Sequence, residues 1–139
     1  MIEFFDSSAL LKLYLVEDGS ERVRAAARVR SRVVVSRIAY AETAATLGRL
    51  FHDGDIDEPK HDALLDLLDE DFPKFDVIEA KRWLGSTLRD LIGRRRLRGM
   101  DAIHLASALT LKPRPRFWSS DRDLADAAEA EGLRVIRPG

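Results

Sequence analysis

Hydrophobic and polar positions along this chain follow two patterns. Short apolar runs bounded by polar residues are typical of buried strands, and longer segments with apolar residues three or four positions apart are typical of amphipathic helices. The short runs predict strands at residues 2–5, 33–35, 75–78, 117–119 and 133–136. The longer segments predict helices at about residues 9–16, 21–30, 38–51, 57–73, 80–96, 100–111 and 124–130.

The order of these elements predicts the fold class. Strands that alternate with helices favour an α/β protein, in which right-handed crossovers build a parallel sheet. The chain has 139 residues, of which 45% are hydrophobic, so we expect one domain over residues 1–139 with a single substantial core. In a sheet of this kind, ligands bind beyond the carboxyl ends of the strands.

Composition excludes several classes of site and leaves others open. The net charge of −1 neither predicts nor excludes a nucleic-acid partner. The absence of cysteine excludes disulfides and thiolate metal sites, and with only three histidines it argues against structural zinc. The N-terminus has no basic start, and no apolar run reaches the roughly 18 residues of a membrane helix. We therefore expect a cytoplasmic protein without a membrane span.

Three carboxylates stand alone in otherwise uncharged stretches. They are Asp6, Glu42 and Asp101, and a fourth acid, Asp121, follows the strand predicted at residues 117–119. An isolated carboxylate in an apolar segment is costly to bury unless another group compensates its charge. The predicted elements place all four acids near one edge of the sheet, so these carboxylates are candidates for a common site.

Each of the four acids also has a simpler explanation. Asp6 and Asp121 could each cap the helix that follows, and Asp123 is a rival of Asp121 for any functional role. Asp101 could be a favourable negative charge in the first turn of its helix. The simpler explanation is weakest for Glu42, because its alanine-rich helix is predicted to lack a wide solvated side.

Carboxylates that converge on one pocket favour a metal site. They repel one another and raise each other's pKa values, and a hard divalent cation with oxygen ligands removes that repulsion. Magnesium suits such a site because it retains waters and binds phosphate oxygens together with one or two carboxylates. Such an ion lowers the pKa of a bound water and neutralises charge on a reacting phosphate. These properties point to a phosphodiesterase.

Four segments of the chain carry a resemblance to a known family. They are DSSALLKLYLVE, VSRIAYAE, MDAIHLASA and FWSSDRDLADAAEAEGLRVI. In this order and spacing they resemble the PIN-domain nucleases, and in particular the VapC-type toxins of type II toxin–antitoxin systems. The resemblance runs the length of the chain. It implies a three-layer α/β/α PIN-like domain whose central parallel sheet has four to five strands.

The resemblance also implies a function and a set of site residues. It assigns the acidic quartet to Asp6, Glu42, Asp101 and Asp121, all of them metal ligands or catalytic groups. Ser119 then orients a carboxylate or a metal-bound water. The family implies an endoribonuclease dependent on Mg²⁺ or Mn²⁺, a homodimer, and inhibition by a cognate VapB-type antitoxin.

Ser7 matches a small polar position of the family directly after the first acid, and it is a candidate supporting residue. His104 lies one helical turn after Asp101, and we interpret it as a core or supporting residue rather than a metal ligand. Trp83 and Trp118 are predicted to lie in the core.

A basic cluster lies just before the third acid. It consists of Arg94, Arg95, Arg96 and Arg98. These arginines could grip RNA phosphates beside the site. They could equally be a solvated positive end of a helix, which is favourable in itself.

Two further functional hypotheses remain beside the toxin. The first is a PIN-fold module that binds nucleic acid or antitoxin with little catalysis, and the second is a housekeeping PIN nuclease that is not a toxin. The sequence is compatible with one metal ion or two.

Overall fold

A five-stranded parallel sheet forms the centre of the computed structural model, which describes residues 1–29 and 32–139. The strands are β1 (Ile2–Phe5), β2 (Arg32–Ser36), β3 (Asp76–Ile78), β4 (Arg116–Trp118) and β5 (Arg134–Ile136). Their order across the sheet is β3-β2-β1-β4-β5, and every neighbouring pair is parallel. The predicted parallel α/β fold is confirmed, and β1 lies at its centre.

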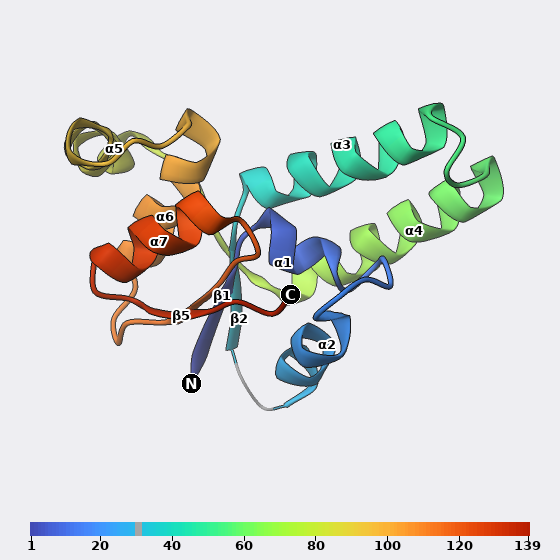
Figure 1. The fold of residues 1–139 in the computed structure, drawn as a ribbon, viewed down its shortest axis with the longest axis horizontal. Coiled ribbons are helices and arrows are strands. Elements are labelled where there is room, and N and C mark those ends of the chain that lie inside the picture. The colour runs from blue at the N-terminus through green and yellow to red at the C-terminus, as the bar shows by residue number, and fades with distance from the viewer. Residues whose placement is uncertain (30–31) are drawn as a thin grey trace.

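Helices cover both faces of this sheet (Figure 1). They are α1 (Ser7–Leu11), α2 (Ser20–Arg28), α3 (Ile38–His52), α4 (Glu58–Asp71), α5 (Gly85–Arg94), α6 (Gly99–Leu109) and α7 (Arg122–Ala130). Two short 3₁₀ turns, Phe72–Lys74 and Arg82–Leu84, precede β3 and α5.

Alternate side chains of each central strand enter different cores. Phe4 packs with residues of α5, α6 and α7, whereas its neighbour Phe5 packs with residues of α1 to α4. This alternation is the ordinary geometry of a strand. The two cores with the sheet between them confirm the three-layer α/β/α arrangement.

Three predicted helices have different bounds in the structure. The first begins at Ser7 and ends at Leu11. Beyond it the backbone forms turns, in which the N–H of each of residues 12–14 bonds to the carbonyl three residues earlier. In the loop that follows, the Ser20 hydroxyl donates to Leu15 O (2.9 Å) and accepts from Glu17 N (3.0 Å). The helix predicted at 80–96 is a 3₁₀ turn followed by α5, and continuous apolar spacing cannot distinguish the two. The helix predicted to end near Arg30 ends at Arg28, and residues 30 and 31 lie outside the described ranges.

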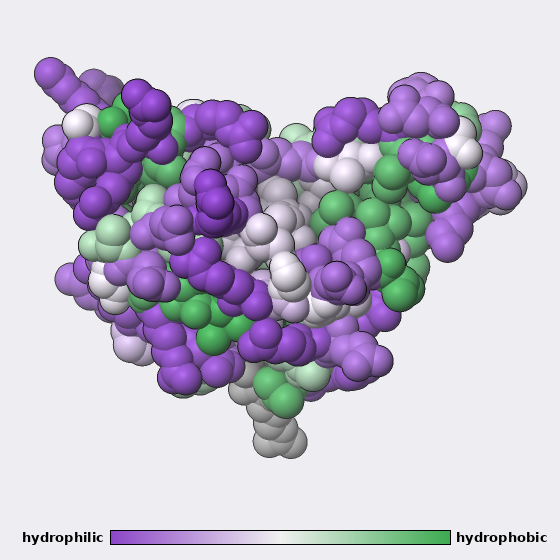
Figure 2. All heavy atoms as spheres, in the orientation of Figure 1, coloured by the Kyte–Doolittle hydropathy of each residue, from purple (hydrophilic) through white to green (hydrophobic). Residues whose placement is uncertain are grey.

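Helices α3 and α4 form a hairpin that extends away from the sheet (Figure 1). Leu47 on α3 and Leu64 and Leu68 on α4 are buried in it, and the Asp57 carboxylate caps α4 by accepting from Lys60 N at 2.9 Å. Figure 2 shows the surface hollowed between this hairpin and the helices on the opposite side of the sheet. The hollow lies beyond the carboxyl ends of the central strands.

The two tryptophans have different environments. Trp118 is buried beside Phe5, as predicted, but Trp83 is 53% exposed and its predicted core position is wrong. Among the helices within residues 1–29 and 32–139, none is both long enough and apolar enough to cross a bilayer.

Candidate functional site

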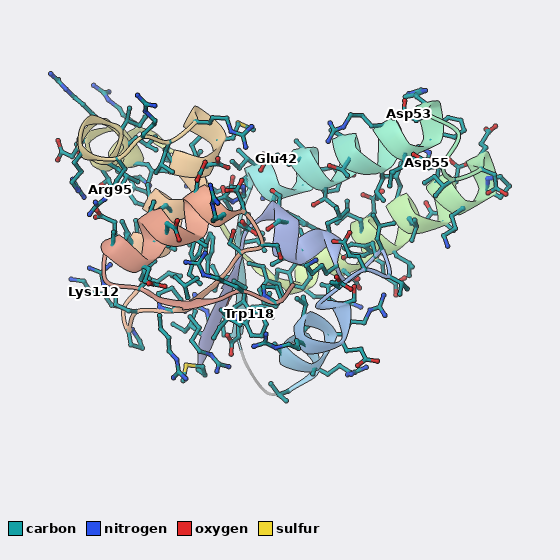
Figure 3. The ribbon with its side chains drawn as sticks, in the orientation of Figure 1. Glu42, Asp53, Asp55, Arg95, Lys112 and Trp118 are labelled. Carbon is teal, nitrogen blue, oxygen red and sulfur yellow. The ribbon has the colours of Figure 1, made fainter. Side chains whose placement is uncertain are left out.

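A cavity of about 350 Å³ opens where β1 and β4 end, and the four predicted acids all line it. They are Asp6 after β1, Glu42 on α3, Asp101 at the start of α6, and Asp121 before α7. Figure 3 shows Glu42 near the N-terminal end of α3, far from Asp53 and Asp55 at the tip of the hairpin. Four segments that are distant in sequence therefore supply carboxylates to one cavity, which we call the acidic cleft.

Asp6 lies at the base of the acidic cleft and is only 2% exposed. Its Oδ1 accepts hydrogen bonds from Ala9 N (2.9 Å) and Ser8 Oγ (2.7 Å), and its Oδ2 accepts one from Ser119 Oγ (2.5 Å). Burial raises the pKa of Asp6, and the hydrogen bonds from Ser119 and Ser8 only partly oppose that rise. Asp6 is thus both the cap of α1 and a member of the cleft, so the two interpretations of the sequence are compatible.

The serines around Asp6 join the ends of β1 and β4. Ser119 Oγ, which donates to Asp6, also accepts from Asp121 N at 3.1 Å. Ser8 Oγ, which donates to the other oxygen of Asp6, accepts from Ser120 N at 2.8 Å. The structure therefore places Ser119 against a carboxylate, and it adds Ser8, whose contact with Asp6 the sequence did not predict.

Glu42 reaches the acidic cleft from the side of the α3–α4 hairpin. Its Oε1 accepts a hydrogen bond from Ser7 Oγ at 2.5 Å and lies 2.5 Å from His104 Nε2. Burial raises the pKa of Glu42, but the hydrogen bonds from His104 and Ser7 outweigh it and the net pKa is lowered. This carboxylate is therefore ionised at neutral pH.

The structure places Glu42 in the acidic cleft. The sequence argument that its alanine-rich helix lacks a wide solvated side is wrong. Helix α3 buries only Ala39, Thr43 and Leu47 within the described structure, and it exposes Ala41 and Ala45 to solvent. An alanine-rich helix can have a wide solvated side, because much of a folded protein's surface is apolar and a single exposed alanine adds little to it.

Arg98 links the two remaining acids. Its guanidinium lies 3.4 Å from Asp101 Oδ2 and 3.5 Å from Asp121 Oδ2. Burial raises the pKa of Asp101 and the negative charge of Asp121 raises it further, whereas Arg98 lowers it. Because the Arg98 side chain is 82% exposed, each of these contacts contributes little to stability, and the arginine is free to leave them.

The structure places Asp121 and Asp123 in different surroundings. Asp121 lines the acidic cleft and caps α7 by accepting from Leu124 N at 3.1 Å. Asp123 is exposed and lines a neighbouring depression instead. The placement favours Asp121 as the fourth acid.

The basic cluster divides into two pairs. Arg94 and Arg95 both contact the Glu131 carboxylate, at 2.7 Å and 2.9 Å, and so connect the end of α5 to the end of α7. Arg98 lies at the acidic cleft, and Arg96 is exposed and forms no ion pair with any residue in the described ranges. Of these four arginines, Arg98 lines the acidic cleft and Arg96 lines the neighbouring depression without an ion pair in the described ranges.

The acidic cleft fits a divalent cation by the chemistry of its donors. Its carboxylates are hard oxygen ligands, Asp6 is buried without a cationic contact among the described residues, and Asp101 and Asp121 repel each other. Within residues 1–29 and 32–139, however, no three acidic or histidine side chains converge closely enough to form a finished ligand set. Arg98 supplies the positive charge that two of the acids contact in this structure.

Comparisons with known proteins agree with this fold. Residues 4–130 match the PIN domain family. Ribonuclease VapC45 and Ribonuclease VapC49, from two strains of Mycobacterium tuberculosis, are each 34% identical over 137 residues, which cover 95% of this chain and 92% of the relative.

Solved structures share the fold at lower identity. FitAcB from Neisseria gonorrhoeae aligns with a TM-score of 0.75 and 18% identity, and it covers 99% of this chain and 98% of that chain. A toxin–antitoxin complex from Klebsiella pneumoniae aligns with a TM-score of 0.70 and 17% identity over the same shares of the two chains. VapC20 of Mycobacterium tuberculosis, a toxin that cleaves the sarcin–ricin loop, aligns with a TM-score of 0.68 and 19% identity, again over 99% and 98%.

Proposed function

This chain belongs to the PIN-domain family, and as a relative of the VapC ribonucleases we propose that it is a metal-dependent endoribonuclease and the toxin of a toxin–antitoxin pair. One observation carries the proposal. Four carboxylates from distant segments line one cavity, and the most deeply buried of them, Asp6, forms no ion pair within the described structure. A buried carboxylate without an ion pair is a natural ligand for a divalent ion.

Each residue of the acidic cleft has a distinct role in the proposed reaction. Asp6, Asp101 and Asp121 would hold Mg²⁺ or Mn²⁺, which when bound lowers the pKa of a water and neutralises charge on the phosphate. Glu42 would bind a second ion or orient the attacking water, and its lowered pKa keeps it ionised for either role. Ser8 and Ser119 hold the Asp6 carboxylate in place.

The proposed partners follow from the same family. Arg98 at the acidic cleft and Arg96 in the neighbouring depression would contact RNA phosphates. By the same family resemblance, we propose that this chain is inhibited by a VapB-type antitoxin and forms a homodimer. The similarity of its fold to that of a toxin–antitoxin complex supports the antitoxin.

The test is cleavage of single-stranded RNA by the purified chain. We expect cleavage with Mg²⁺ or Mn²⁺, no cleavage in EDTA, and a loss of about a hundredfold or more in Asp6→Asn, because a charge contact worth several kcal/mol is removed. Asp123→Asn is the matched control, since Asp123 is exposed outside the acidic cleft, and it should cleave at the wild-type rate.

Two outcomes would contradict the nuclease. Cleavage by Asp6→Asn at the wild-type rate would show that the acidic cleft does not take part in the reaction. RNA binding without cleavage in either metal would instead support a PIN-fold binding module.

A further inference from the structure

Three side chains from three separate helices meet at one carboxylate oxygen in the acidic cleft. Ser7 Oγ on α1 and His104 Nε2 on α6 each lie 2.5 Å from Glu42 Oε1 on α3. Ser7 Oγ and His104 Nε2 are themselves 3.1 Å apart. His104 is 1% exposed, so the contact holds the partly exposed Glu42 against a side chain of the core.

The surroundings of His104 determine which ring nitrogen carries its proton. His104 Nδ1 is buried and has no hydrogen-bond partner among the described residues. A buried N–H without an acceptor is costly, so the favoured tautomer has its proton on Nε2 and leaves only a lone pair on Nδ1. Nε2–H then donates to Glu42, and the Ser7 hydroxyl donates to the same oxygen.

This arrangement is not a nucleophilic triad. In such a triad the acid contacts one ring nitrogen and the hydroxyl contacts the other. Here both Glu42 and Ser7 approach Nε2, and no acid faces Nδ1 within the described structure. The Ser7 proton is directed at a carboxylate, so Ser7 is a donor and not a nucleophile.

The two donors occupy only one of the two oxygens of Glu42. Within the part of the chain that the structure describes, Oε2 makes no hydrogen bond, and Glu42 lines the acidic cleft. His104 lies on the same helix as Asp101, three residues further on. The contact therefore fixes a residue of the solvated α3 relative to an acid on α6, across the cleft.

We infer that His104 and Ser7 are positioning residues that anchor Oε1 of Glu42 and so present Oε2 to the reacting phosphate or its water. This inference rests on the proposed nuclease activity and adds the geometry that Glu42 needs for it. Partners of this kind that orient a site carboxylate typically change activity or metal affinity by about tenfold to a hundredfold when they are removed.

A pair of variants of similar size tests the hydrogen bond itself. His104→Gln retains an N–H near the position of Nε2, whereas His104→Met has a side chain of the same length without a donor. For variants that unfold at matched temperatures, we expect His104→Met to lower kcat for RNA cleavage about tenfold to a hundredfold with little change in KM. His104→Gln should recover most of that loss, and Ser7→Ala should have a smaller effect because His104 remains.

Two kinetic outcomes would overturn the positioning role. The first is wild-type kcat in folded His104→Met. The second is a His104→Gln enzyme as slow as His104→Met, since the defect would then come from packing and not from the donor.

A second measurement does not depend on cleavage. Nitrogen NMR of the histidine side chains in the metal-free full-length chain should show His104 protonated on Nε2, with a protected Hε2 that is lost in Glu42→Ala. The His104→Gln spectrum identifies the signal among the three histidines. A proton on Nδ1, or an Hε2 unchanged in Glu42→Ala, would overturn the anchoring contact.

The two proposals can fail separately. Full activity of Asp6→Asn, or no cleavage by the wild type, would overturn the proposed nuclease activity. The positioning role of His104 and Ser7 would then fail with it, whatever the NMR shows. Loss of cleavage in Asp6→Asn together with an unaffected His104→Met would leave the nuclease intact and overturn only the positioning role.

Discussion

Glu3 and Asp6 are two buried carboxylates at either end of one short stretch, and their surroundings differ. Glu3 is 0% exposed and forms an ion pair with Arg116, whose Nε lies 3.0 Å from both carboxylate oxygens. Trp118 Nε1 donates to it at 2.6 Å. Asp6, 2% exposed, is held only by hydroxyls and one backbone N–H in the described structure. Burial alone therefore does not distinguish these two acids; what differs is the ion pair that Glu3 forms and Asp6 does not.

The sheet explains why the two acids differ. Glu3 lies within β1, directly opposite Arg116 in the parallel register with β4, so its partner is supplied by the neighbouring strand. Asp6 follows the end of β1, where no further strand residue lies opposite and the acidic cleft opens. The carboxyl edge of a parallel sheet thus leaves a charge available to a ligand.

The same contrast separates the arginines. Arg94 and Arg95 share the Glu131 carboxylate, whereas Arg96 has no ion pair in the described ranges and Arg98 contacts only acids of the cleft. Charges that are paired inside the fold stabilise it, and the remaining charges are available for binding. Substitutions at the two kinds of position should therefore affect different measurements.

The largest expected effect on stability is at Glu3. Glu3→Ala leaves Arg116 and the buried Trp118 N–H without their acceptor and should lower the free energy of unfolding by about 3 kcal/mol. Glu3→Gln retains an acceptor and should cost less. Urea unfolding in EDTA measures both, with Asp6→Asn as the comparison. If Asp6→Asn is more destabilising than Glu3→Ala, the ion pair of Glu3 does not distinguish the two buried acids.

A smaller effect is expected in the pH dependence of stability. Burial raises the pKa of Asp6 above its ordinary 3.8, so its contribution to stability is complete below that pH and is lost as the pH rises through the folded-state pKa. Asp6→Asn removes this loss. In metal-free protein, its free energy of unfolding minus that of the wild type should therefore increase from pH 4 to pH 7 and become positive. A difference that stays flat or falls would show that Asp6 is not an uncompensated charge.

The smallest effect concerns RNA binding. Arg96→Gln with Arg98→Gln should reduce the slope of log affinity against log salt by about 1.4, as expected for two lost phosphate contacts to single-stranded RNA. Arg94→Gln with Arg95→Gln is the matched control and should leave the slope unchanged while weakening the contact with Glu131. Equal slopes for the two double variants would mean that the internal pairing of these arginines does not decide their role.

The sequence predicted the fold for mainly physical reasons, whereas among the four acids Asp121 was assigned chiefly through the family resemblance. Alternating strands and helices dictate a parallel sheet, and Asp6 and Asp101 were conspicuous because each is isolated among uncharged residues. Asp121 could not be separated from Asp123 by local polarity, because the choice depends on how the start of α7 is turned toward the cleft.

Contacts between distant segments could not be predicted from the sequence. Glu3 carries the same signal as Asp6, a charge in an apolar run, and only the register with β4 reveals Arg116 as its partner. The approach of His104 to Glu42 depends on how α3 packs against α6, which periodicity along one helix does not contain. The early end of α1 was missed because apolar periodicity does not distinguish an α-helix from the turns with three-residue bonds that follow it.

The central claim is that Asp6 lacks an internal cation because the acidic cleft is built to bind one from solution. Calorimetric titration of Mn²⁺ into the metal-free chain tests it directly. Wild type and Asp123→Asn should bind Mn²⁺ with the same affinity, and Asp6→Asn should lose at least about tenfold of it. Binding of Mn²⁺ by Asp6→Asn at wild-type affinity would contradict the claim.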